Sequence, residues 1–74
     1  MISVSVSYPR NMFWQEGDRH IINLAQKWEG IVWSKDWNDD IRDMDIEFET
    51  TANVRSFKED VESNLDWCKV SNIY

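Results

Sequence analysis

The sequence predicts a small α+β domain in which two helices cover one face of an antiparallel sheet. Two segments, residues 2–8 and 43–49, alternate strictly between apolar and polar side chains, which is typical of strands with one buried face. Two others, residues 14–28 and 52–67, repeat apolar side chains at helical spacing. A chain of 74 residues with 42% hydrophobic content allows one domain, residues 1–74, with one compact core.

The first strand is expected over residues 2–8. Its apolar positions are Ile2, Val4, Val6 and Tyr8, and the intervening positions are all serine. A period of two places these sets on opposite faces of a sheet, so the serines form a small polar outer face. Pro9 ends the strand because proline cannot donate a hydrogen bond to the ladder.

The first helix is expected over residues 14–28. Its apolar stripe has the i, i+3, i+4, i+7 spacing and consists of Ile21, Leu24, Ala25 and Trp28. Asp18 suits the N-cap or the first turn, because its carboxylate can accept from the free N–H groups there. Gly30 suits the stop, since glycine readily ends a helix.

A second strand is expected over residues 31–37, and its orientation has two interpretations. One parity holds Trp33, Lys35 and Trp37, and the other holds Val32, Ser34 and Asp36. In the favoured interpretation the two tryptophans cap the core from an edge strand, and the other parity faces outward. In the alternative, the tryptophans form an exposed binding patch, since tryptophan is a frequent interface anchor.

The third strand, residues 43–49, has the clearest pattern in the chain. Its inward positions are Met44, Ile46 and Phe48, and its outward positions are Asp43, Asp45, Glu47 and Glu49. A turn over residues 38–40 precedes it, and Asp36, Asp39 and Asp40 extend the negative field into this hairpin. Lys35 of the second strand is expected to offset part of the repulsion between the acids of this row.

The second helix is expected over residues 52–67 and a short edge strand over residues 68–74. The helix stripe consists of Val54, Phe57, Val61 and Leu65, with Cys68 on its continuation. The resulting β-α-β-β-α-β order is the ferredoxin-like, split βαβ arrangement. It makes the first and third strands central neighbours and puts both helices on one face.

The acidic row is the main candidate for a binding site. Alternate residues of a strand lie about 6.6–6.8 Å apart, close to the spacing of phosphates along a nucleic-acid strand. A net charge of −6 disfavours direct binding of nucleic acid. RNA-recognition domains share this element order, but they stack bases on outward aromatics, where this chain has serines and acids. The row therefore indicates either a basic protein partner or simply a solvated sheet face.

The sequence offers little for catalysis or metal binding. His20 is the only histidine, Cys68 the only cysteine, and neither belongs to a catalytic set. A calcium-loop pattern matches at Asp36, Asn38, Asp40 and Glu47, but Ile41 stands where that loop needs glycine. We therefore expect no enzyme activity, no cofactor and no metal.

The resulting hypothesis is a non-enzymatic, acidic protein-binding module that acts as a small inhibitor or regulator of a partner protein by mimicking the charge of a nucleic acid. The expected contact residues are Asp36, Asp39, Asp40, Asp43, Asp45, Glu47, Glu49, Trp33 and Trp37. In composition alone the chain resembles small phage-encoded inhibitors of host or defence proteins, such as anti-CRISPR proteins. The alternative is a small ACT-like regulatory or ligand-binding domain that dimerises through its sheet.

The same hypothesis sets the expected compartment and partners. The N-terminus has no signal-peptide layout, and no apolar run reaches the length of a membrane span. The protein is therefore expected in the cytoplasm, that of the host if it is phage-encoded. Its expected partner is a protein with a basic surface, such as a nucleic-acid-binding protein, rather than a nucleic acid or a membrane.

Overall fold

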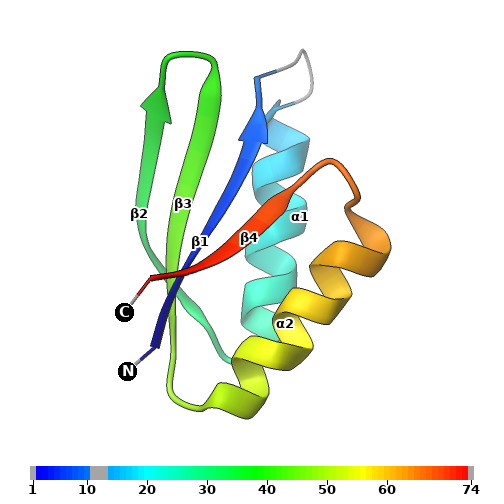
Figure 1. Ribbon diagram of the computed structural model, residues 1–74. Helices are drawn as coiled ribbons and strands as arrows, with labels where there is room; N and C mark the ends of the chain where they lie inside the picture. The colour runs from blue at the N-terminus through cyan, green and yellow to red at the C-terminus, as the bar shows by residue number, and fades with distance from the viewer. Residues whose placement is uncertain (1, 11–13, 74) are drawn as a thin grey trace.

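A computed structural model describes residues 2–10 and 14–73 (Figure 1). The elements follow in the order β1 (Ile2–Pro9), α1 (Trp14–Lys27), β2 (Ile31–Asn38), β3 (Ile41–Phe48), α2 (Thr51–Asn64) and β4 (Lys69–Ile73). The four strands form one antiparallel sheet in the order β2-β3-β1-β4. This is the predicted ferredoxin-like arrangement, with β1 and β3 in the centre. Tyr74, expected in the last strand, lies outside the described residues.

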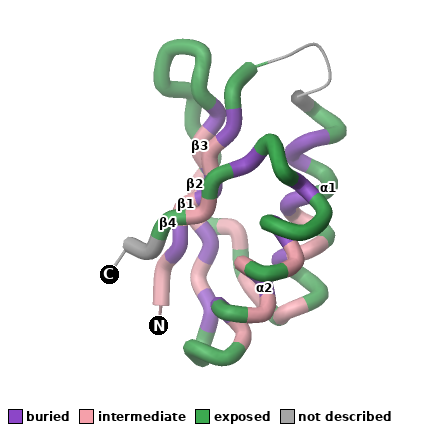
Figure 2. Tube along the Cα trace, turned by 45° about the vertical axis from the view of Figure 1, so that its right-hand side comes forward, coloured by how far each residue is buried: buried purple, intermediate pink, exposed green. Residues whose placement is uncertain are grey.

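Both helices pack on one side of the sheet, and the core lies between these two layers (Figure 2). The sheet supplies the inward residues of β1 and β3, namely Val4, Val6, Tyr8, Met44, Ile46 and Phe48. The helices and the segment after α2 supply Ile21, Ala25, Val54, Phe57, Val61, Leu65 and Cys68. Burying each large apolar side chain contributes about 1.5–3 kcal/mol, so the alternation of β1 and β3 drives folding directly.

The helix ends differ slightly from expectation. α1 begins at Trp14, so Asp18 lies in the second turn rather than at the N-cap or in the first turn. In α2, the Thr50 Oγ1 accepts from the Asn53 N–H at 3.1 Å, and the helix ends at Asn64, three residues before the predicted Trp67. After α1, Glu29 rather than Gly30 takes the left-handed conformation, with φ of 62°. Gly30 is needed for another reason, because a Cβ there would lie 2.5 Å from the Phe48 ring.

The two helices are tied together at one point by Asp60. Its Oδ2 accepts from the Trp28 Nε1–H at 2.7 Å and lies 2.9 Å from the Lys27 Nζ. These contacts hold the pKa of Asp60 below its ordinary value, chiefly through the Lys27 hydrogen bond. Trp28 is therefore half-buried, with its ring against the core and its polar end at the helix junction.

A β-bulge at Trp33 changes the orientation of β2 part-way along the strand. Val32 lies opposite Ile46, on the helix side, and the register with β3 then shifts between Val32 and Ser34. After the bulge, Ser34 lies opposite Asp45 on the outward side and Lys35 opposite Met44 on the helix side. The favoured sequence interpretation is therefore right for the faces of Ser34, Asp36 and Trp37 and wrong for Val32. It is also wrong for Trp33, which is 55% exposed and does not cap the core. An extra residue in one strand reverses the parity, and no simple alternation reveals it.

Candidate functional site

The sheet face away from the helices forms the candidate site, which we call the acidic face. Cross-strand partners share a face, and the register gives its described members as Ser3, Ser5, Ser7, Pro9, Ile31, Ser34, Asp36, Asn38, Ile41, Asp43, Asp45, Glu47, Lys69 and Ser71. Negative charge gathers over β2 and β3, serines occupy β1, and Lys69 stands on β4. The inward and outward parities predicted for β1 and β3 are confirmed.

Asp36 and Asp43 lie directly opposite each other on the acidic face. Like charges in this position destabilise an antiparallel pair by a few tenths of a kcal/mol to about 1 kcal/mol. The Ser34 Oγ–H donates to the Asp36 Oδ2 at 3.1 Å, which satisfies one oxygen without adding positive charge. On the other flank of Asp43 lies Ser7. The arrangement concentrates negative charge at the β2–β3 junction.

No lysine or arginine among the described residues forms a salt bridge with the acidic face. The salt bridges found among the described residues lie elsewhere, and they join Arg19 to Glu16, Lys27 to Asp60 and Arg42 to Asp18. Lys35 lies opposite Met44, on the helix side of the sheet, so it does not stand in the acidic row. The expectation that Lys35 offsets the repulsion from within the row is therefore wrong, because the bulge turns that side chain to the other face.

The remaining predicted acids lie at the two ends of β3. Asp39 and Asp40 form the exposed turn between β2 and β3, and Asp39 has a φ of 56°, which aspartate tolerates. The Asp40 carbonyl accepts from the Arg10 N–H at 2.6 Å, which ties this turn to the end of β1. Glu49 lies just after β3, at the opposite end, and is exposed. The acids thus extend along the whole strand.

Trp33 and Trp37 do not form one patch. Trp33 is the bulged residue and is 55% exposed, whereas Trp37 is 37% exposed and lies opposite Arg42 on the helix side. The guanidinium groups of Arg10 and Arg42 lie 5.0 and 4.9 Å from the Trp37 ring centroid. Trp37 therefore stacks with these guanidinium groups on the helix side, and Trp33 is the more accessible of the two.

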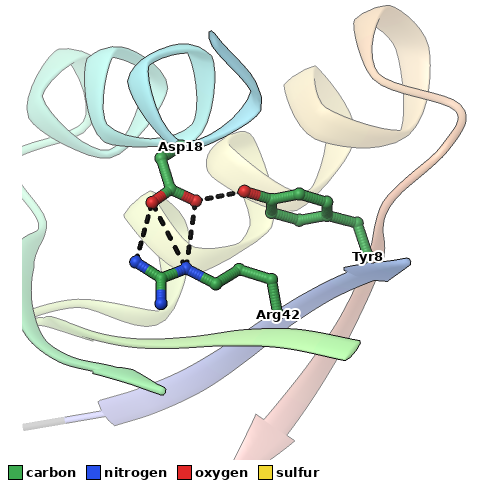
Figure 3. A network of polar contacts seen from close by, with 3 residues as sticks. All are labelled: Tyr8, Asp18 and Arg42. Carbon is green, nitrogen blue, oxygen red and sulfur yellow. Dashed lines mark hydrogen bonds and ion pairs between the residues drawn. The ribbon is translucent and has the colours of Figure 1, made fainter. Parts of the chain in front are cut away.

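Behind the acidic face, three buried polar side chains join β1, α1 and β3 (Figure 3). The Arg42 Nη2 donates to the Asp18 Oδ2 at 2.8 Å, and the Arg42 Nε lies 3.3 and 3.2 Å from the two Asp18 oxygens. The Tyr8 hydroxyl donates to the Asp18 Oδ1. Burial and this hydrogen bond raise the pKa of Tyr8 well above its ordinary value. The hydrogen bond to Asp18 raises the pKa of Arg42, so the guanidinium stays charged.

Sequence reasoning missed this network, although two signals were present. Asp18 precedes Ile21 and Ala25 by three and seven residues, which puts it on the buried stripe of the helix. Arg42 has the same parity as Met44, so it belongs to the inward face of β3. Opposite charges on two faces predicted to meet in the core indicate a buried pair, because an unpaired charge there is costly.

An open depression of about 380 Å³ lies where β4 stops short of β1. The β1–β4 pairing ends at Ser7 and Lys69, and beyond it the Trp67 ring stands edge-on to Tyr8 with centroids 5.1 Å apart. Pro9 and Ile41 complete the lining. Its walls are mainly apolar, with one exposed lysine at the rim, and nothing in it resembles a catalytic group.

The residues considered for chemistry are scattered. In the described part of the chain, no three histidine, cysteine or acidic side chains are placed to hold a metal ion. Of the calcium-loop pattern, Asp36 and Glu47 lie on adjacent strands, opposite Asp43 and Ile31. His20 is exposed on α1. Cys68 is buried, and burial raises the pKa of its thiol to about 12.

No family model matches the chain, and no curated protein is significantly similar to it. Over the described residues, neither helix has the length and apolar character that crossing a membrane requires.

Proposed function

We propose that the protein is a non-enzymatic binding module whose acidic face engages a basic surface of a partner protein. By covering that surface it acts as a small inhibitor or regulator, in the way a phage-encoded anti-defence protein such as an anti-CRISPR protein blocks its target. A partner that normally binds DNA or RNA fits best, because the acidic row has the spacing and sign of a phosphate backbone.

The observation that carries this proposal is the Asp36–Asp43 pair, which forms no salt bridge with any described lysine or arginine. Solubility alone does not require like charges directly opposite each other, and the fold bears a stability cost for them. Lys or Arg side chains of a partner relieve this repulsion on binding. This relief of repulsion is therefore specific to a basic partner, and the negative field of the acidic face steers the partner's approach.

The acidic face also argues against the alternative of an ACT-like domain that dimerises through its sheet. Two copies stacked face to face would bring Asp43, Asp45 and Glu47 of each against the same residues of the other. Like charges facing each other cost several kcal/mol, which favours a partner of opposite charge over a second copy.

The test is affinity capture followed by titration of the captured partner at two salt concentrations. Asp45→Lys/Glu47→Lys is expected to fold and to lose binding, because it turns the local charge from −2 to +2. The matched control is Glu59→Lys/Glu62→Lys on the exposed surface of α2, which changes the net charge equally. Equal binding by both variants would contradict the acidic-face proposal, as would an affinity that does not fall with salt.

A further inference from the structure

β2 is an edge strand whose outer side has no partner in the sheet. An edge strand presents a row of N–H and C=O groups that can pair with another chain. β2 has eight residues, against five in β4 at the other edge. It also carries the two most exposed large apolar side chains of the described residues, Ile31 at 61% and Trp33 at 55%.

The part of β2 after the bulge is suited to regular pairing. Residues 34–38 pair without interruption with residues 45–41 of β3, so this stretch is a regular ladder with no second strand beside it in the sheet. Asp36 stands at its centre on the acidic face, next to Asp43. Lys35 and Trp37 flank Asp36 on the helix side. A strand added here meets one carboxylate on one face and a lysine and an indole on the other.

A second copy of the chain is a poor occupant of this edge. Antiparallel self-pairing over the whole stretch places Asp36 opposite Asp36. With Asp43 behind each, four carboxylates would then lie in one cross-strand row. Each copy also carries a net charge of −6. Like-charge pairs of this kind destabilise a ladder, so pairing between the β2 edges of two copies is disfavoured.

We propose that β2 binds an extended segment of the partner as a fifth strand, with a Lys or Arg of that segment opposite Asp36. Main-chain pairing supplies the affinity, and the side chain opposite Asp36 supplies the specificity. The inserted cation lies beside two carboxylates that form no salt bridge within the described part of the chain. The neighbouring positions of the segment face Trp37, which suits an aliphatic residue, and Lys35, which suits a polar or acidic one. This proposal rests on the proposed function, since it names the kind of basic surface that the acidic face receives.

Two synthetic heptapeptides separate strand pairing from charge attraction. In the first, lysine alternates with valine, and in the second, prolines replace the valines, which keeps the charge but removes every second N–H donor and fixes φ at those positions away from the antiparallel value. Each is titrated into the isotopically labelled protein, and amide hydrogen exchange is followed residue by residue. The lysine–valine peptide is expected to bind about tenfold more tightly than the lysine–proline peptide, and to slow exchange at the β2 amides that do not pair with β3.

Variants locate the contact. Asp36→Lys is expected to weaken the lysine–valine peptide at least about tenfold, whereas the control Glu59→Lys leaves its affinity unchanged. Equal binding of both peptides with no slowed exchange in β2 would overturn the fifth strand and leave the acidic-face proposal standing. Slowed exchange in β4 instead would also overturn it. Binding of neither peptide at low salt would contradict both proposals.

Discussion

The Arg42 guanidinium and the Asp18 carboxylate form a buried ion pair, 2.8 Å apart at their closest atoms, with side chains only 10% and 11% exposed. Asp18 comes from α1 and Arg42 from one end of β3, a central strand of the sheet, so the pair joins the two layers of the fold. The Tyr8 hydroxyl is the third member of this buried network and donates a hydrogen bond to the Asp18 Oδ1. A carboxylate bound on both oxygens can be buried without the penalty of an isolated charge.

Removing one member of the Asp18–Arg42 pair is expected to lower the stability of the fold severely. Arg42→Ala leaves the Asp18 charge buried and uncompensated, which costs about 3–5 kcal/mol. A domain of this length has a total stability of only about 4–11 kcal/mol, so the variant is expected to be largely unfolded or close to it. Urea denaturation followed by circular dichroism measures the loss.

The triple variant Tyr8→Phe/Asp18→Leu/Arg42→Met tests whether the pair is needed for stability as such. Replacing all three polar groups by apolar ones of similar size is expected to restore most of the stability, because no charge is then left unpaired. A wild-type urea midpoint for Arg42→Ala alone would contradict the buried pair.

The contrast between the buried pair and the strands shows what the sequence predicts well. Strict alternation places Val4 and Ile46 on the inward face, because only one register buries every apolar residue. The bulge at Trp33 is invisible to that reasoning, since β2 is an exposed edge strand whose residues impose no single parity. The Asp18–Arg42 pair was not predicted from the sequence for a different reason. Each charge is readily assigned to solvent alone, and only the fold brings the two together.

Stability is expected to fall at alkaline pH through Tyr8 and Cys68. Both pKa values are raised in the folded protein, that of Cys68 to about 12 from 9.0. The unfolded chain therefore releases these protons first, and the stabilisation is complete below about pH 9 and declines above it. Each group contributes a slope of up to about 1.4 kcal/mol per pH unit once its unfolded form has ionised.

Two variants separate these contributions to the alkaline decline. Cys68→Ala is expected to remove the part that begins near pH 9, and Tyr8→Phe the part that begins near pH 10, where free tyrosine ionises. Thermal unfolding measured from pH 7 to 11 gives both profiles. A wild-type Tm that stays constant up to pH 11 would show that neither group is protected.

The inward face of β3 is tested by a charge at its centre. Ile46 is fully buried against the helices, so Ile46→Asp places an unpaired carboxylate in the core and is expected to unfold the domain. Asp45→Asn is the neighbouring control, since it changes an outward side chain and is expected to shift stability by less than about 0.5 kcal/mol. If both variants melt like the wild type, the assigned faces of β3 are wrong.

The repulsion between Asp36 and Asp43 gives the prediction most closely tied to the proposed function. Asp36→Asn keeps the size of the side chain and an oxygen that can accept from the Ser34 hydroxyl, but it removes one of two opposed charges. It is therefore expected to raise the free energy of unfolding by about 0.2–1 kcal/mol. The gain should shrink as salt is added, because screening weakens the repulsion in the wild type.

Asp39→Asn, in the exposed turn next to this ladder, is the matched control and should give a smaller gain. Urea denaturation at low and high ionic strength measures both. A loss of stability in Asp36→Asn at low salt would show that the opposed carboxylates do not destabilise the fold. Binding of a basic partner would then relieve no repulsion.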